Sequence, residues 1–292
     1  MPAIFYLFAE SPLFFLSFVF IISLLVGSFL NVVIYRLPIM MEREWKQMYQ
    51  DYFNPEQASA KPVDTFNLVK PDSTCPKCQH KIRAWENIPV LSWLFLKGKC
   101  SQCKNPISFR YPAVEFLTAF ASTIIAWHFG FGWQAAMAVV LTWSLVALIF
   151  IDIDKMLLPD QITLPLLWLG LLLSVFNVFV PAHDAIIGAA AGYLSLWSVY
   201  WLFKLATGKE GMGFGDFKLL AALGAWIGWQ HLAIIILLSS FVGAIIGISM
   251  LLVKGKDKGT HIPFGPYLAI AGWLTLIIGQ DIADLYWQWA FA

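Results

Sequence analysis

The four cysteines are the residues of this chain with the clearest metal chemistry. They form two C-x2-C pairs with 21 residues between them: Cys75, Cys78, Cys100 and Cys103. Ile82 and Ile107 follow the two pairs at the same offset, so the two halves repeat each other. Such pairs are typical of knuckles that present four thiolates to one tetrahedral Zn²⁺, and two disulfides are the alternative. Four thiolates leave no open position for a reactive water, so we predict a structural zinc.

Two groups of acidic residues have the side chains that acid–base chemistry needs. Asp152 begins the acidic run 152–160, and Asp216 follows the glycine-rich segment 211–215. Two carboxylates that share one proton can hydrolyse a peptide without a metal: the ionised one takes a proton from water, and the protonated one polarises the carbonyl. We expect Asp216 to be the base, because the start of a helix beside it favours its ionised form, and Asp152 to be the acid.

Structural roles remain open for the same carboxylates. Asp216 alone is a suitable N-cap, and so is Asp160 after Pro159. Asp154 is able to pair with Lys155 or to face water. The chemistry therefore depends on whether the fold brings Asp152 and Asp216 together.

The composition indicates which elements position these residues. The 292 residues are 59% hydrophobic and 13% charged, with a mean hydropathy of +0.71. That is too few charges to cover a water-facing surface, which excludes a cytosolic enzyme, a disordered chain and a secreted disulfide scaffold. Eight apolar runs are long or apolar enough for membrane helices: 13–37, 113–129, 133–151, 162–180, 185–203, 217–228, 232–253 and 265–278. We predict an all-α polytopic membrane protein of about eight transmembrane helices with a small cytoplasmic zinc-knuckle module.

The basic residues predict the orientation of these helices. Of the 19 Lys and Arg residues, 12 lie between Arg36 and Arg110, and all 19 lie at or beside the connections after the first, third, fifth or seventh run. The positive-inside rule places these connections in the cytoplasm and both termini outside. The cysteines then lie in a reducing compartment, which favours zinc, and both acidic groups lie on one side of the membrane. Residues 1–10 lack Lys and Arg, so we expect the first helix to stay as an anchor.

In combination, the motifs of this chain resemble those of the type IV prepilin peptidases, which are bifunctional leader peptidases and N-methyltransferases. The resemblance lies in residues 27–38, both cysteine pairs, and residues 85–89, 110–115, 152–160, 213–216 and 262–266. The Gly-x-Gly-Asp segment ending at Asp216 is also similar to that of presenilin-type intramembrane proteases. The expected organisation is an anchor over 1–37, a cytoplasmic loop with the zinc module over 38–110, and a transmembrane aspartic peptidase core over 111–292.

The resemblance implies a specific activity. Asp152 and Asp216 would be the catalytic pair that removes the short basic leader of prepilins and pseudopilins, after a Gly, at the cytoplasmic face of the inner membrane. The new N-terminal residue, usually Phe, would then be N-methylated with S-adenosylmethionine. The enzyme would serve type IV pilus assembly, type II secretion, or both. Its partners would be these substrates and membrane lipid, and the net charge of +1 gives no indication of nucleic-acid binding.

The methyl-transfer site is much less visible in the sequence. No glycine-rich turn of a Rossmann-like segment is present, so Asn31, Arg36 and Glu115 beside the first loop are the positions to examine. Hydrogen bonding and charge pairing at the membrane edge is the alternative role for these three. Lys218 is suited either to tuning Asp216 or to contacting lipid headgroups.

Two other functions are compatible with the same motifs. The carboxylates could form a cation path in a transporter or scaffold, although the acidic residues cluster at the cytoplasmic edge and not within the spans. The zinc module could also be a docking site for a soluble partner.

Overall fold

The structure, a computed structural model, describes residues 3–53, 65–254 and 262–290. Within these ranges the regular elements are all helices, accompanied by two isolated β-bridges. The chain forms two compact units, Met1–Phe131 and Gly132–Ala292. Each unit is described by itself below.

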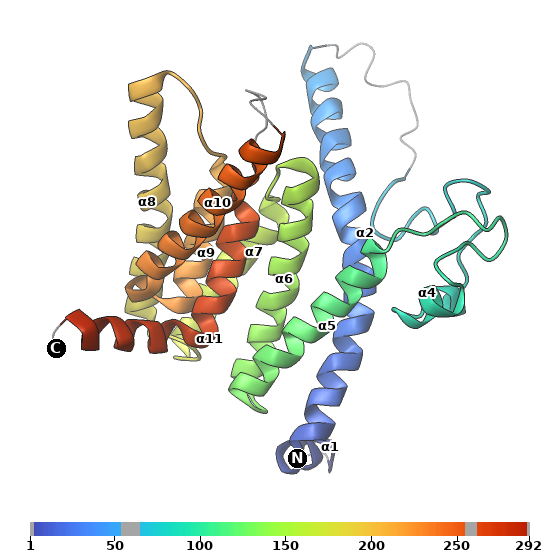
Figure 1. Ribbon diagram of the computed structural model, residues 1–292, viewed down its shortest axis with the longest axis horizontal. Coiled ribbons are helices and arrows are strands. Elements are labelled where there is room, and N and C mark those ends of the chain that lie inside the picture. Colours follow the sequence, from blue (N-terminus) through green and yellow to red (C-terminus); the bar gives the residue numbers. More distant parts are fainter. Residues whose placement is uncertain (1–2, 54–64, 255–261, 291–292) are drawn as a thin grey trace. The chain divides into compact units, whose positions relative to one another are not determined.

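The first unit is built on two helices that pack along each other, α2 (Pro12–Phe53) and α5 (Arg110–Phe129). They lie side by side in Figure 1, with the short helix α1 (Ala3–Glu10) before α2. The segment between them holds a 3-10 helix, η1 (Ala84–Asn87), and a short helix, α4 (Leu91–Phe95). Gly27 permits the close approach of α2 and α5, because a Cβ there would lie 2.8 Å from the Cα of Glu115.

Helix α2 continues well beyond residue 37, where its apolar run ends. Pro38 lies inside the helix and removes one backbone hydrogen bond there. The residues that follow, 42–53, are rich in Glu, Lys, Gln and Met, which are strong helix formers, and this propensity favours continuation of the helix through the proline. The polar segment after the first span therefore begins as helix and not as loop.

The second unit is arranged around one short helix, α9 (Phe214–Ile227). Around it lie α7 (Asp160–Val175), α8 (Ala182–Thr207), α10 (Leu232–Lys254) and α11 (Gly265–Ala290), all of which contact it. Helix α6 (Trp133–Lys155) packs against α7 and α11, and a 3-10 helix, η2 (Trp229–His231), precedes α10. Every residue of α9 from Leu219 to Ile227 is buried.

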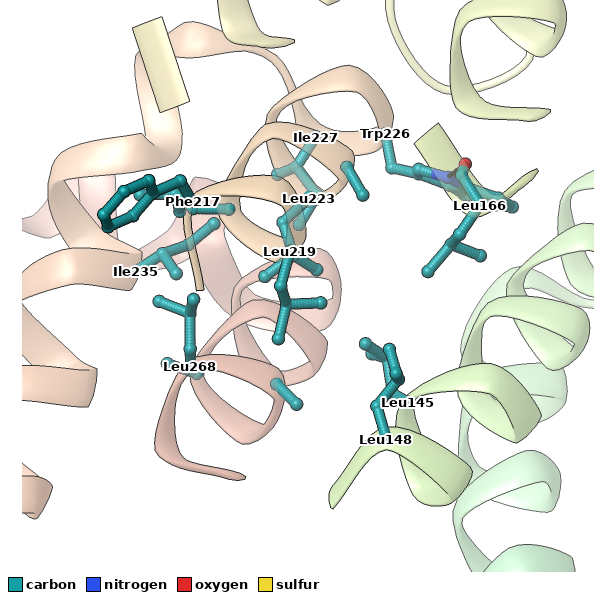
Figure 2. Packing of buried hydrophobic residues seen from close by; sticks show 14 of the residues in the cluster. Leu145, Leu148, Leu166, Phe217, Leu219, Leu223, Trp226, Ile227, Ile235 and Leu268 are labelled. Carbon is teal, nitrogen blue, oxygen red and sulfur yellow. Dashed lines mark hydrogen bonds between the residues drawn. The ribbon is translucent and has the colours of Figure 1, made fainter. Parts of the chain in front are cut away.

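Side chains of α9 fill the core of the second unit on several sides. Figure 2 shows Phe217, Leu219, Leu223, Trp226 and Ile227 of α9 with Leu145 and Leu148 of α6, Leu166 of α7, Ile235 of α10 and Leu268 of α11. The indole Nε1 of Trp226 donates to the carbonyl of Leu166 at 2.8 Å, which satisfies the one polar atom of this buried ring. The core therefore fixes α9 in place from its first turn to its last.

Two glycines allow α8 and α9 to cross in backbone contact. A Cβ on Gly188 would collide with the carbonyl of Gly224, and a Cβ on Gly224 would collide with that of Gly188. Small residues at such a crossing let membrane helices pack closely, where dispersion replaces the hydrophobic effect as the attraction between them.

The structure confirms the predicted all-helical membrane fold. Each of the eight apolar runs coincides with a helix, although the fourth ends early, at Val175, before Asn177 adopts a left-handed φ of 51°. Five segments are long and apolar enough to cross a membrane: Pro12–Phe53, Trp133–Lys155, Ala182–Thr207, Trp229–Ser249 and Gly265–Ala290. Helices α7 and α9 are shorter, and α5 is not among these five segments. Eight crossings therefore remain a prediction, whereas a multi-pass membrane protein is established.

Candidate active site and zinc centre

The four cysteine sulfurs of the first unit converge on one point. Their Sγ atoms all lie within 4.8 Å of one another, with Cys75 3.7 Å from Cys103 and Cys78 4.0 Å from Cys100. All four thiols are free, and these separations are about twice a disulfide bond. Four sulfurs at about 2.3 Å from a central zinc would lie about 3.8 Å apart in a tetrahedron. The donor set and its spacing therefore fit a tetrahedral zinc ion.

The two knuckles share one backbone design, as the repeated sequence predicts. In the first, the N–H of Gln79 donates to the carbonyl of Cys75, and in the second the N–H of Lys104 donates to that of Cys100. Gln79 and Lys104 have left-handed φ values of 59° and 58° at equivalent positions. Each knuckle closes with one β-bridge, Thr74 to Lys81 and Lys99 to Pro106. Two copies of one hairpin thus supply two thiolates each.

His80, which lies near enough in sequence to be a substitute ligand, pairs with Glu86 instead. Its Nε2 lies 3.1 Å from Oε2 of Glu86, and the same oxygen accepts from the backbone N–H of Arg83 at 2.8 Å. These contacts, led by the Arg83 N–H and joined by the Ser101 hydroxyl, lower the pKa of Glu86 to about 2. Glu86 thus links η1 to both knuckles, since His80 follows the first pair and Ser101 lies inside the second.

Glu86→Gln should loosen the zinc module at neutral pH. With a pKa lowered to about 2, the carboxylate contributes its full stabilisation above its ordinary pKa of about 4.3 and loses it only as the pH falls toward 2. Gln keeps a hydrogen-bond acceptor but loses the charge. The free energy that holds the module folded should fall by about 1 kcal/mol, which is about fivefold in the equilibrium constant. We expect a chelator to strip zinc about fivefold faster, measured with a chromogenic indicator. Glu44→Gln, on the exposed part of α2, is the control, and equal stripping rates for the two variants would contradict the prediction.

Asp152 lies near the end of α6 and is held by the start of another helix. It is 5% exposed, and its Oδ2 accepts from the backbone N–H of Gly265, the first residue of α11, at 3.0 Å. A Cβ on Gly265 would lie 2.6 Å from this oxygen, so glycine is needed for the contact. The carboxylate therefore lies against the positive end of α11.

Asp216 is the third residue of α9 and is 7% exposed. Its backbone N–H donates to the carbonyl of Gly213 at 3.3 Å, at the start of the helix. Its Oδ1 is buried and has no hydrogen-bond partner among the residues that the structure describes. An orphaned carboxylate oxygen is costly in a protein interior, and such atoms often serve a ligand or a reaction. The side chain does not act as an N-cap, because the N-cap residue is Gly213.

Asp152 and Asp216 occupy one neighbourhood within the second unit. Both carboxylates are buried, and the residues beside them contact one common side chain, that of Leu158. The side chain of Leu158 packs against two glycines. One is Gly215, next to Asp216, and the other is Gly265, whose N–H binds Asp152. The ends of α6, α9 and α11 therefore meet at a pair of buried carboxylates.

Two family models match most of the chain. The model described as bacterial Peptidase A24 N-terminal domain matches residues 21–129, and that described as type IV leader peptidase family matches residues 139–248. The chain belongs to the type IV leader peptidase family. The two matches divide between the two compact units, and the second includes Asp152 and Asp216.

Curated members of the family resemble this chain over nearly its whole length. The prepilin leader peptidase/N-methyltransferase of Aeromonas hydrophila is 59% identical over 277 residues, covering 94% of both chains. The protein of the same name from Stutzerimonas stutzeri is 57% identical over 283 residues, covering 97% of both. That from Pseudomonas aeruginosa is 57% identical over 292 residues, covering 99% of both. No solved structure matches the chain.

The three positions considered for methyl transfer, Asn31, Arg36 and Glu115, form hydrogen bonds to the backbone within the first unit. Asn31 donates to the carbonyl of Tyr111 at 3.1 Å. Arg36 donates to the carbonyls of Asn67 and Pro71 at 3.0 and 2.6 Å. These contacts fit the alternative of membrane-edge hydrogen bonding.

Glu115 shows the same use of a buried polar side chain. Its Oε2 accepts from the N–H of Val90 at 2.8 Å, and Ser28 also hydrogen bonds to the carboxylate. Val90 has a φ of 59°, a rare value for a β-branched residue, so the buried Glu115 holds a strained turn. None of these contacts gives a reason to assign a ligand of S-adenosylmethionine.

Two contacts of the peptidase unit escaped sequence reasoning. Lys218 forms an ion pair with Asp160, since its Nζ lies 2.7 Å from each of the two carboxylate oxygens. Gly265 was visible only as part of the motif 262–266, and its contact with Asp152 spans 113 positions. The periodicity of apolar residues along the sequence predicts neither the contact of Lys218 with Asp160 nor that of Gly265 with Asp152.

Proposed function

We propose that this protein removes the leader peptide of prepilins and pseudopilins at the cytoplasmic membrane face, with Asp152 and Asp216 as the catalytic pair. The observation that carries the proposal is the meeting, around Leu158, of two buried carboxylates from separate helices, one of which has an oxygen without a hydrogen-bond partner among the described residues. Its relatives are named prepilin leader peptidase/N-methyltransferase, which supports the same substrate class. Pilus assembly, secretion or both would depend on this step.

The carboxylates would act through one shared proton. The ionised carboxylate takes a proton from water as the oxygen adds to the peptide carbon, and the protonated one donates to the carbonyl oxygen. The C–N bond then breaks, and a proton passes to the leaving amine, which becomes the new N-terminus. The starts of α9 and α11 favour negative charge here, through the position of Asp216 and through the Gly265 N–H on Asp152.

Gly265→Ala should impair cleavage without unfolding the protein. The added Cβ would lie 2.6 Å from Oδ2 of Asp152 and 3.1 Å from the methyl carbons of Leu158, so the carboxylate must move. A misplacement of this kind costs roughly ten- to a hundredfold in rate. The rate of leader removal measures the effect. Gly132→Ala is the control, because nothing lies within 4 Å of its Cβ, and equal rates for the two variants would contradict the role of Gly265.

The second activity is N-methylation of the new terminus. S-adenosylmethionine would supply the methyl group from its sulfonium sulfur to the amine nitrogen. Asn31, Arg36 and Glu115 are engaged with the backbone of the first unit, so the proposal assigns no residue to this step.

The four-cysteine cluster is proposed to hold structural zinc on the cytoplasmic side. Its geometry suits a closed site, and a loop of this size with few buried side chains gains most of its stability from the metal. The zinc would therefore shape the loop and take no direct part in hydrolysis.

One experiment tests both activities. The purified protein is incubated in detergent with a prepilin and S-adenosylmethionine, and the product is analysed by mass spectrometry. Loss of the leader mass and a gain of about 14 Da on the new terminus would support the proposal. An intact prepilin, with ion flux into liposomes that depends on Asp152, would instead support a transporter.

A further inference from the structure

An ion pair joins the helix that carries Asp216 to the segment that follows Asp152. Nζ of Lys218 lies 2.7 Å from Oδ1 and 2.7 Å from Oδ2 of Asp160. Lys218 is in the first turn and a half of α9, two residues after Asp216, and Asp160 is the first residue of α7. The pair therefore connects residues 58 positions apart in the chain. Asp160 follows Asp152 closely in the sequence, and Lys218 follows Asp216 closely.

The segment that bears Asp160 is held at a second point. After α6 ends, Met156 adopts a left-handed φ of 52°, and Leu158 then packs toward Gly215 and Gly265. A Cβ on Gly215 would lie 2.8 Å from the Cβ of Leu158. The turn between α6 and α7 is thus fixed against the start of α9 by one apolar contact and one ion pair.

We propose that Asp160 and Lys218 are positioning residues, whose ion pair sets the placement of Asp216 relative to Asp152. This inference rests on the proposed peptidase function. Two carboxylates that share a proton repel each other once both are ionised, and Oδ1 of Asp216 has no partner in the described residues to restrain it. The ion pair supplies a restraint from outside the reacting pair, because it holds the first turn of α9 against the turn after α6.

Because the ion pair is partly exposed, its effect on the position of Asp216 can be measured separately from its effect on the stability of the fold. The side chain of Lys218 is 28% exposed and that of Asp160 is 50% exposed. Ion pairs this open to solvent contribute little to the free energy of unfolding. Loss of the pair should therefore leave the melting temperature nearly unchanged, while a small displacement of Asp216 lowers the rate of the chemical step.

The test measures kcat and KM for prepilin cleavage in four variants. Lys218→Met and Asp160→Asn should each lower kcat by roughly ten- to a hundredfold, with KM within about twofold. The double variant should lose no more than the worse single variant, because both changes remove the same contact. Lys218→Arg, which keeps the charge and is able to contact both oxygens, should retain most of the native kcat.

Two controls make the outcomes decisive. Lys209→Met removes an exposed lysine on the segment before α9, and a loss equal to that of Lys218→Met would assign the effect to lipid headgroups and overturn the proposal. Native kcat in Lys218→Met, a change in KM alone, additive losses in the double variant, or no rescue by Lys218→Arg would also overturn it. Asp216→Asn is assayed alongside: if it cleaves, the proposed function itself fails, whereas an inactive Asp216→Asn with a fully active Lys218→Met defeats only this inference.

Discussion

Asp152→Asn and Asp216→Asn should each abolish leader removal while the protein stays folded. Asparagine matches the shape of aspartate but neither takes nor donates the shared proton. Loss of a general acid or base costs roughly 10²- to 10⁴-fold in rate. Because each carboxylate is buried, its replacement by a neutral amide removes a charge that is costly in the interior, so the helices should remain packed. Mass spectrometry of the prepilin after a fixed incubation measures the loss.

Asp154→Asn is the matched control for this experiment. Asp154 lies in the same acidic run but is exposed, so its loss should leave cleavage near the native rate. Retained zinc and an unchanged melting temperature would show that the inactive variants are folded. Substantial cleavage by the Asp152 or Asp216 variant would remove that residue from the mechanism.

Cys75→Ser and Cys100→Ser should each release the zinc and unfold the module around it. A serine hydroxyl replaces a thiolate, so the tetrahedral site loses one of its four ligands. The free energy of metal binding is the folding free energy of such a small unit, amounting to about 10–16 kcal/mol in zinc-finger peptides. We expect one zinc per native chain and almost none in the variants, measured by elemental analysis, with a proteolytically sensitive loop over residues 65–110.

Gln102→Ser is the control for the zinc variants, because Gln102 is exposed between Cys100 and Cys103 and offers no thiolate. Cleavage by the Cys75→Ser variant should fall less than its zinc content, since the metal acts through the loop and not on the peptide. A native chain without zinc and with Cys75–Cys78 disulfides would reverse the assignment.

The sequence carried enough information for the elements and for the metal cluster. Solid apolar runs predict helices by a local rule, and the repeat of Ile82 and Ile107 after the cysteine pairs predicts two equivalent hairpins, which the structure contains. The family motifs pointed to Asp152 and Asp216, and the fold buries both in the second unit, where Leu158 contacts the residues beside each of them.

What the sequence did not reveal depends on distant contacts. The N–H of Gly265 that holds Asp152, and the carboxylate of Asp160 that holds Lys218, belong to residues far apart in the chain. The course of α2 through Pro38 was hidden for a different reason, since a proline and a change in polarity both predict an end there, and helix propensity prevailed.

Because α9 is surrounded by other helices, its positions should tolerate fewer substitutions than those of the outer helices. A helix that faces lipid has one side on which apolar residues exchange at little cost, and α8 and α10 each carry exposed apolar side chains, such as Leu194 and Leu237. The residues from Leu219 to Ile227 have no such side. In a library that substitutes every position of the second unit in turn, mutational tolerance should therefore drop sharply along α9, including its positions farthest from the carboxylates.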